Sequence, residues 1–246
     1  MSGFYQSIAP WYDRIFPVDP EAVAFAAKRI GIPAAGASAP SVLDAGCGTG
    51  GLALALAGLG FRVTGIDSDA DMVRLATEKC RAFPNAQFEV MDLRDAGSRF
   101  YADSFSAAVC FGNTLVHLTS RDEISGFIRK VRGMLKKDGL FLAQILNYDW
   151  ILDQGLTVLP AIEDDKIRFE RTYRPEAGSE RFWFRTVLTV KSGPRVIENA
   201  VPLIPLRRAE LAGMLANAGF GNVEWFGDFN GGPLTEQSLP LIVVAG

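Results

Sequence analysis

Short apolar runs alternate with helical stretches between residues 41 and 146, and this alternation constrains the fold more than any other feature. Five runs have the length and apolar content of buried strands, namely 41–45, 62–67, 87–92, 105–111 and 140–146. Strands that alternate with helices form a parallel sheet with helices on both faces. The carboxyl ends of such strands share one edge, where ligands bind. The sequence therefore predicts an α/β fold with its functional site at that edge.

The helix before the fifth run carries its own boundary signals. Ser120 and Glu123 form an S-x-x-E capping box, which predicts a helix start. Lys136 and Lys137 precede Gly139, a pattern typical of a helix C-terminus. The sequence therefore predicts a helix that runs to about Lys137.

The whole chain divides into four segments by pattern. Residues 1–40 are predicted to be helical and rich in aromatic side chains, with a linker of Ala, Gly and Pro at the end. Residues 41–150 hold the alternating core, and 151–206 contain three strand-like runs that predict a small antiparallel β insertion. Residues 207–246 predict a helix and two closing strands. The closing strands complete a doubly wound, mostly parallel sheet of seven strands.

Composition and charge narrow the class of partner. The 246 residues carry a formal net charge of -3 and no basic stripe, which argues against nucleic acid. No run is long and apolar enough to span a bilayer, and the N-terminus lacks the pattern of a signal peptide. Three widely spaced cysteines predict neither a disulfide framework nor a zinc site, and no metal is expected. We expect a cytoplasmic protein without membrane association.

A glycine-rich turn, VLDAGCGTGG at residues 42–51, joins the first strand to its helix. Glycines there let the backbone approach a ligand and adopt positive φ. Gly46, Gly48 and Gly51 also satisfy the dinucleotide pattern G-x-G-x-x-G, so an NAD site is an alternative. Asp44 argues against an NAD site, because a carboxylate at this position would repel a pyrophosphate but attract an ammonium group. This residue favours a ligand with an ammonium group.

Two further acids follow the second and third strands. Asp67 is placed to accept hydrogen bonds from ribose hydroxyls, a role common to several nucleoside sites. Asp92, followed by Leu93, is placed to meet an adenine amino group. Helix capping is the alternative role for each acid alone. Three acids in a row beside a glycine turn favour a nucleoside ligand.

The segments VLDAGCGTG, VTGID and VMDL resemble motifs I to III of the class I S-adenosylmethionine-dependent methyltransferases, which have a Rossmann-like fold. The resemblance covers the chain to about residue 146, and the closing strands resemble the reversed hairpin of that fold. It implies S-adenosylmethionine as cofactor, S-adenosylhomocysteine as product, and a cofactor-binding core at 41–150 under a lid at 1–40. The residues implied at the cofactor are Tyr5, Arg14, Asp44, Gly46, Cys47, Gly48, Asp67, Ser68, Met72, Asp92, Leu93, Phe111 and Gly112.

A narrower resemblance lies in CFGNTLVHL (110–118) and NYDWIL (147–152), which are similar to stretches of glycine N-methyltransferases and their small-molecule relatives. It implies that Gly112 and Asn113 border the sulfonium and the substrate, and that His117 points into the pocket. The glycine-specific enzymes have an arginine directly before Asn-Tyr-Asp, where this chain has Leu146. That departure argues against glycine as the acceptor.

Three residues are candidates for catalysis: His117, Asn113 and Tyr12. His117 is the one histidine of the sequence, and it is either a base, a polar anchor for the acceptor or a structural residue. Tyr12 can offer an aromatic face to a sulfonium, or it packs in an amphipathic helix.

In the insertion, arginines and aromatics recur at alternating positions, namely Arg168, Arg171, Tyr173, Arg181, Trp183 and Arg185. These predict a solvated face or a subunit contact, with a cap that selects the acceptor as the alternative.

The sequence as a whole predicts a methyltransferase that moves a methyl group to a nitrogen or oxygen of a small-molecule acceptor by in-line displacement. An NAD-dependent oxidoreductase and a non-catalytic module that binds S-adenosylmethionine are the alternatives. Assembly into a homo-oligomer is left open.

Overall fold

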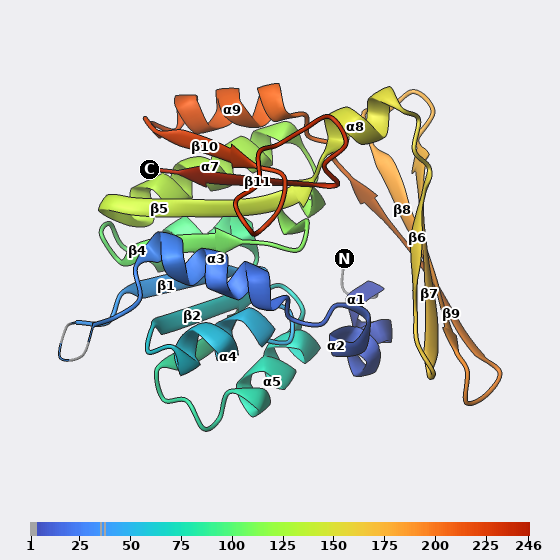
Figure 1. Cartoon of the computed structure of the whole chain (residues 1–246), viewed down its shortest axis with the longest axis horizontal. Coiled ribbons are helices and arrows are strands. Elements are labelled where there is room, and N and C mark those ends of the chain that lie inside the picture. Colours follow the sequence, from blue (N-terminus) through green and yellow to red (C-terminus); the bar gives the residue numbers. More distant parts are fainter. Residues whose placement is uncertain (1–3, 35, 37) are drawn as a thin grey trace.

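The computed structural model describes residues 4–34, 36 and 38–246, and it contains two separate β-sheets (Figure 1). Residues 1–3, 35 and 37, which belong to the predicted 1–40 segment, lie outside the described residues. One sheet has seven strands and is mostly parallel, and the other has four antiparallel strands. The predicted α/β class, with a reversed C-terminal hairpin and an antiparallel insertion, is confirmed.

In the seven-stranded sheet, β1 pairs in parallel with β2 on one side and with β4 on the other. Strand β11 runs antiparallel to β5 and β10, which makes the reversed hairpin. In spatial order the strands are β10 (Val223–Phe226), β11 (Pro240–Ala245), β5 (Leu135–Leu146), β4 (Phe105–Cys110), β1 (Ser41–Ala45), β2 (Arg62–Asp67) and β3 (Ala86–Val90).

Helices cover both faces of this sheet (Figure 1). Successive residues of β1 point to opposite faces, so Val42 joins the core under α3 and α4, whereas Leu43 joins the core under α7 and α9. The helices of the core are α3 (Pro20–Ile30), α4 (Gly51–Gly58), α5 (Ala70–Lys79), α6 (Ala96–Arg99), α7 (Arg121–Met134) and α9 (Arg208–Asn217), with 3-10 turns η2 (Leu93–Asp95) and η3 (Thr114–His117). The sheet is thereby buried on both sides.

Helix α7 begins as predicted, because the Ser120 hydroxyl accepts a hydrogen bond from Glu123 N at 3.2 Å. Its predicted end is wrong. The helix stops at Met134, and Leu135 is already extended and paired with Phe105 of β4. Leu135 is 3% exposed, so the pairing buries an apolar side chain that the lysine pattern could not reveal.

The second sheet has the order β6-β7-β8-β9, and one of its strands was missed in the sequence. The strands are β6 (Val158–Glu163), β7 (Ile167–Pro175), β8 (Phe182–Val190) and β9 (Arg195–Leu203). Strand β6 contains Pro160, and it lies at the edge, where a missing N–H is tolerated. A short helix, α8 (Tyr148–Asp153), was also missed, and the predicted boundary at residue 150 falls inside it.

The N-terminal helices lie between the two sheets (Figure 1). They are α1 (Phe4–Ile8), the 3-10 turn η1 (Ala9–Trp11) and α2 (Tyr12–Ile15). Helix α1 contacts both β9 and α5, so it links the insertion to the core. Among the described residues, no helix is both long and apolar enough to cross a membrane.

Candidate functional site

The turn between β1 and α4 requires glycine for steric reasons. Gly46 has φ 81°, and a Cβ there would lie 2.3 Å from Thr114 Cγ2. Gly48 has φ 52°, and a Cβ there would lie 3.1 Å from the Tyr12 ring. Both residues therefore place backbone directly against side chains of the site.

The amide groups of this turn donate hydrogen bonds to other groups of the protein. Gly46 N and Cys47 N both donate to Ile66 O, at 2.8 and 3.0 Å, and Gly48 N donates to an oxygen of Asp67 at 3.0 Å. A dinucleotide site needs such amides for its pyrophosphate. Because these three are already used, the turn does not offer the phosphate cradle that the NAD alternative requires.

Asp44 is buried at the end of β1, with one carboxylate oxygen, Oδ2, that has no hydrogen-bond partner among the described residues. Burial, assisted by the neighbouring charge of Asp67, raises the pKa of Asp44 to about 7. An unpaired buried carboxylate is unfavourable unless a cation or donor meets it. The ammonium group of S-adenosylmethionine fits this position.

Asp67 ends β2, and its carboxylate bridges two loops. One oxygen accepts from Gly48 N and the other from Asp69 N, each at 3.0 Å. Burial raises the pKa of Asp67, and these amide bonds oppose the rise. Each carboxylate oxygen can accept more than one hydrogen bond, so Asp67 can still accept from ligand hydroxyls.

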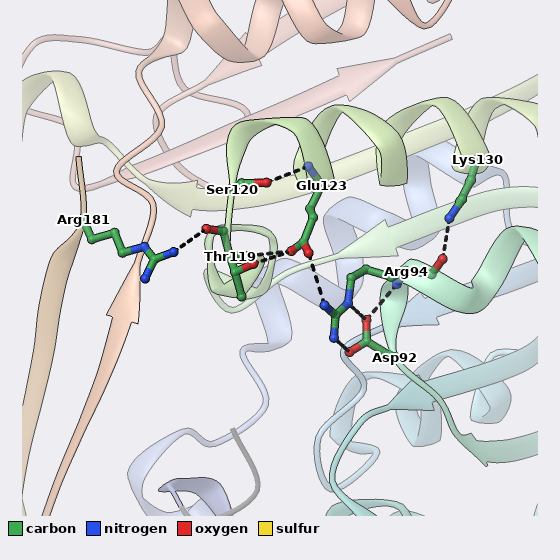
Figure 2. Close-up of polar contacts among 7 residues, drawn as sticks. All are labelled: Asp92, Arg94, Thr119, Ser120, Glu123, Lys130 and Arg181. Atoms are coloured by element: carbon green, nitrogen blue, oxygen red, sulfur yellow. Dashed lines mark hydrogen bonds and ion pairs between the residues drawn. The ribbon is translucent and has the colours of Figure 1, made fainter. Parts of the chain in front are cut away.

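Asp92 lies two residues beyond β3 and caps η2 (Figure 2). Arg94 donates to both oxygens of Asp92, through Nε at 2.9 Å and Nη2 at 2.8 Å. These hydrogen bonds lower the pKa of Asp92, so it is ionised at neutral pH. Asp92 thus has the capping role that was its alternative, and it also lines the cavity described next.

The Asp92 loop is tied to the second sheet through a chain of polar contacts (Figure 2). Arg94 donates to Glu123 at 3.1 Å, and Glu123 accepts from Thr119 N at 2.8 Å. Thr119 O in turn accepts from Arg181, the residue before β8, at 3.3 Å. The contacts connect η2, the start of α7 and the insertion.

A cavity of about 790 Å³, here called the edge cavity, follows the carboxyl ends of β1 to β4. The lining residues are Tyr5, Tyr12, Gly46, Gly48, Asp67, Ser68, Asp69, Met72, Asp92, Leu93, Gly112, Thr114, His117 and Leu118. The edge cavity is therefore lined by acidic side chains, by the glycines of the turns after β1 and β4, and by apolar side chains.

A second cavity of about 700 Å³, here called the intersheet cavity, lies between the core and the insertion. Its lining residues are Tyr5, Tyr12, Phe16, Gly112, Asn113, His117, Gln144, Leu146, Leu159, Arg171, Tyr173 and Phe184. Tyr5, Tyr12, Gly112 and His117 line both cavities. The two cavities therefore meet at a shared wall.

His117 belongs to that shared wall, at the end of η3. Its Nε2 lies 3.0 Å from the Tyr5 hydroxyl, and its buried Nδ1 has no partner among the described residues. Burial lowers the pKa of His117 to about 4, so the imidazole is neutral at physiological pH. The residue can orient groups by hydrogen bonding, but it is a weak base.

Asn113 holds the loop after β4 with φ 63°. Its Oδ1 accepts from Leu146 N at 2.9 Å, and its Nδ2 donates to the Tyr148 hydroxyl at 3.2 Å. Gly112 N donates to Gln144 Oε1 at 2.8 Å. These bonds fix the loop that separates the two cavities.

Three other predicted residues lie elsewhere. Cys47 and Phe111 line a neighbouring hollow together with Asp44, below α2. Arg14 lines none of these cavities, and it forms ion pairs with Asp164 and Asp165 in the turn between β6 and β7. The structure therefore does not bring Arg14 to the other predicted site residues.

Gln144 and Arg171 line the intersheet cavity but were not among the predicted site residues. Gln144 had a signal, since it is the one polar residue in the apolar run LFLAQIL. Arg171 was grouped with Arg168 on a solvated face or subunit contact, with an acceptor-selecting cap as the alternative. The two residues are an odd number of positions apart on β7 and therefore lie on opposite faces. Within the described residues, no cluster of three or more His, Cys, Asp or Glu could hold a metal.

Comparisons of family, sequence and structure all find methyltransferases. The profile of the family described as "Methyltransferase domain" matches residues 42–139. The glycine/sarcosine N-methyltransferase of Aphanothece halophytica is 29% identical over 199 residues, which are 78% of this chain and 70% of that protein. The CcbJ methyltransferase of Streptomyces caelestis superposes with a TM-score of 0.80 at 25% identity, over 97% of this chain and 95% of that one.

A third similar structure is CalS10 of Micromonospora echinaspora, an amino pentose methyltransferase with bound S-adenosylmethionine. It has a TM-score of 0.67 at 20% identity, over 94% of this chain and 93% of that one. The family match covers the glycine turn and the three acids of the edge cavity. Together with the sheet order and the relatives, it supports a class I S-adenosylmethionine-dependent methyltransferase.

Proposed function

We propose that the enzyme methylates an amine nitrogen of a small molecule held in the intersheet cavity, with the methyl donor held in the edge cavity. The observation that carries this proposal is the shared wall of Tyr5, Tyr12, Gly112 and His117. A group-transfer reaction needs two ligands in contact at one point. The two cavities provide that arrangement.

The donor is assigned to the edge cavity by its charges and its shape. Asp44, which lines the neighbouring hollow that meets the edge cavity at Gly46, pairs with the ammonium group, as its unpartnered Oδ2 favours. Asp67 accepts from the ribose hydroxyls, and Asp92 accepts from the adenine amino group. Met72 and Leu93 supply buried apolar surface against the adenine.

When bound, S-adenosylmethionine supplies an electrophilic methyl group that a nucleophile takes by in-line displacement, which leaves S-adenosylhomocysteine. The chain's own contribution is alignment and exclusion of water. The partly buried rings of Tyr5 and Tyr12, on the N-terminal helices, lie at the junction between the cavities. Asn113 and Gln144 fix the loop at Gly112 beside it.

Nitrogen is favoured over oxygen because the shared wall, as the described residues form it, holds no strong base. An alcohol needs its proton removed as it attacks, whereas a neutral amine attacks through its lone pair. His117, with a pKa of about 4, is poorly suited to deprotonate an alcohol. The relative from Aphanothece halophytica is also named as an N-methyltransferase.

The proposal is tested by measuring S-adenosylhomocysteine release with a panel of primary and secondary amines, each paired with the alcohol of the same carbon skeleton. Release is expected with amines and not with their paired alcohols, and the rate should rise with pH as the amine loses its proton. Methylation of alcohols in preference to the paired amines would contradict the assignment of nitrogen.

A further inference from the structure

We infer that Arg171 forms an anion-binding subsite on the wall that β7 gives to the intersheet cavity, and that this subsite selects acceptors that carry a carboxylate. This inference rests on the proposed function, because it assigns the acceptor to that cavity. It adds a specificity-determining residue from the insertion.

Arg171 occupies an unusual position on β7. Its neighbours on the same face, Phe169 and Tyr173, are buried at 0% and 3% exposure, because alternate residues of the strand point inward. Arginine is among the residues least often found on an inward face without a paired acid. Arg171 nevertheless lines the cavity beside Tyr173 and Phe184.

The guanidinium of Arg171 is only partly satisfied. Nη2 donates to Pro160 O at 2.7 Å, whereas the buried Nε has no partner among the described residues. Burial lowers the pKa of Arg171 from its usual value, which reflects the unfavourable desolvation of its charge. A bound carboxylate would supply the missing acceptor and the opposite charge, in the paired geometry that guanidinium favours.

A second unsatisfied polar group lies next to Arg171. Thr186 of β8 is directly opposite it in the register, and its hydroxyl is buried without a hydrogen-bond partner among the described residues. Directly opposite residues have Cβ atoms about 5 Å apart. Buried polar groups without a partner are few in folded proteins, and each calls for an explanation, such as a bound ion or ligand.

The charges of the two cavities are complementary to an amino acid. Arg171 is the one charged side chain that lines the intersheet cavity within the part of the chain described, since His117 is neutral. The edge cavity carries the acids Asp67, Asp69 and Asp92. An acceptor with a carboxylate at Arg171 would therefore direct its amine toward the shared wall and the methyl donor.

The test uses the protein saturated with S-adenosylhomocysteine and titrated with matched pairs that differ only in carboxylate or amide, such as phenylalanine with phenylalaninamide and β-alanine with β-alaninamide. Calorimetry should show at least about tenfold tighter binding of the carboxylate member in one or more pairs, as expected for a charge-assisted contact. Arg171→Gln should reduce that preference to within about twofold, and Arg171→Lys, which keeps the charge but not the paired geometry, should be intermediate.

Arg168→Gln is the matched control, because Arg168 lies on the opposite face of β7 and pairs with Glu163 and Glu170. It should keep the wild-type preference. Equal binding of both members of every pair, or an unchanged preference in Arg171→Gln, would overturn the inference. So would a loss of S-adenosylhomocysteine affinity in Arg171→Gln, because Arg171 would then serve the donor's own carboxylate. A wild-type protein that ignores S-adenosylhomocysteine would instead refute the proposed function.

Discussion

At the scale of single residues, the proposed donor site contains one acid, Asp44, that the described residues leave partly unsatisfied. Asp44 is buried, shares its surroundings with Asp67, and keeps one oxygen without a partner among the described residues. Its folded-state pKa of about 7 is above the usual value of about 3.9 for an aspartate. The stabilising contribution of Asp44 is therefore complete below about pH 4 and is lost as the pH rises through about 7.

The affinity for the ligand should depend on pH in the opposite sense and increase as the pH rises. An ammonium group beside Asp44 favours the ionised carboxylate, so binding requires loss of its proton at lower pH. We expect S-adenosylhomocysteine to bind roughly tenfold more tightly at about pH 8 than at about pH 6, as measured by calorimetry. Asp44→Asn should bind more weakly and lose the pH dependence. Wild-type affinity that is constant over this range would contradict the role of Asp44.

At the scale of elements, the Asp92 loop is held in place by the start of α7 (Figure 2). Glu123 accepts from Thr119 N and from the Thr119 hydroxyl, and it pairs with Arg94, which holds Asp92. One glutamate thus supports a helix start and a side chain of the edge cavity.

Glu123→Ala should lower the free energy of unfolding by about 1 kcal/mol, the usual effect of losing such a capping contact. It should also weaken S-adenosylhomocysteine binding about threefold or more, because Arg94 and Asp92 lose a fixed partner. Urea unfolding and calorimetry measure the two effects. Asp122→Ala is the control, since Asp122 is exposed in the same turn. Wild-type affinity for S-adenosylhomocysteine in Glu123→Ala would show that the start of α7 does not support the ligand site.

Elements set by local pattern were predictable, and elements set by pairing were not. The run 41–45 and the closing strand at 240–245 agree with the structure, because an apolar run between turn signals is a local property. The end of α7 was misplaced because it depends on the pairing of Leu135 with β4. Strand β6 was missed because Pro160 is acceptable only at a sheet edge, which the sequence does not identify.

At the scale of the whole molecule, the insertion, the core and the N-terminal helices all contribute residues to the intersheet cavity. The glycine turn and the three acids could be predicted because consecutive strands deliver them to the same edge. Arg171 could not be assigned, because its position depends on the register of β7 against its neighbours and on how two sheets pack. Arg14 was misplaced for a similar reason, since its partners Asp164 and Asp165 are 150 residues away or more in the sequence.

The most direct test of the account is calorimetric titration of the purified protein with S-adenosylhomocysteine and, separately, with NADH. We predict saturable binding of S-adenosylhomocysteine and none of NADH. Asp67→Ala should weaken binding by about tenfold or more, equivalent to ~1.4 kcal/mol for a lost charged hydrogen bond, whereas Glu78→Ala, an exposed residue of α5, should not. Absence of S-adenosylhomocysteine binding by the wild-type protein would contradict the account.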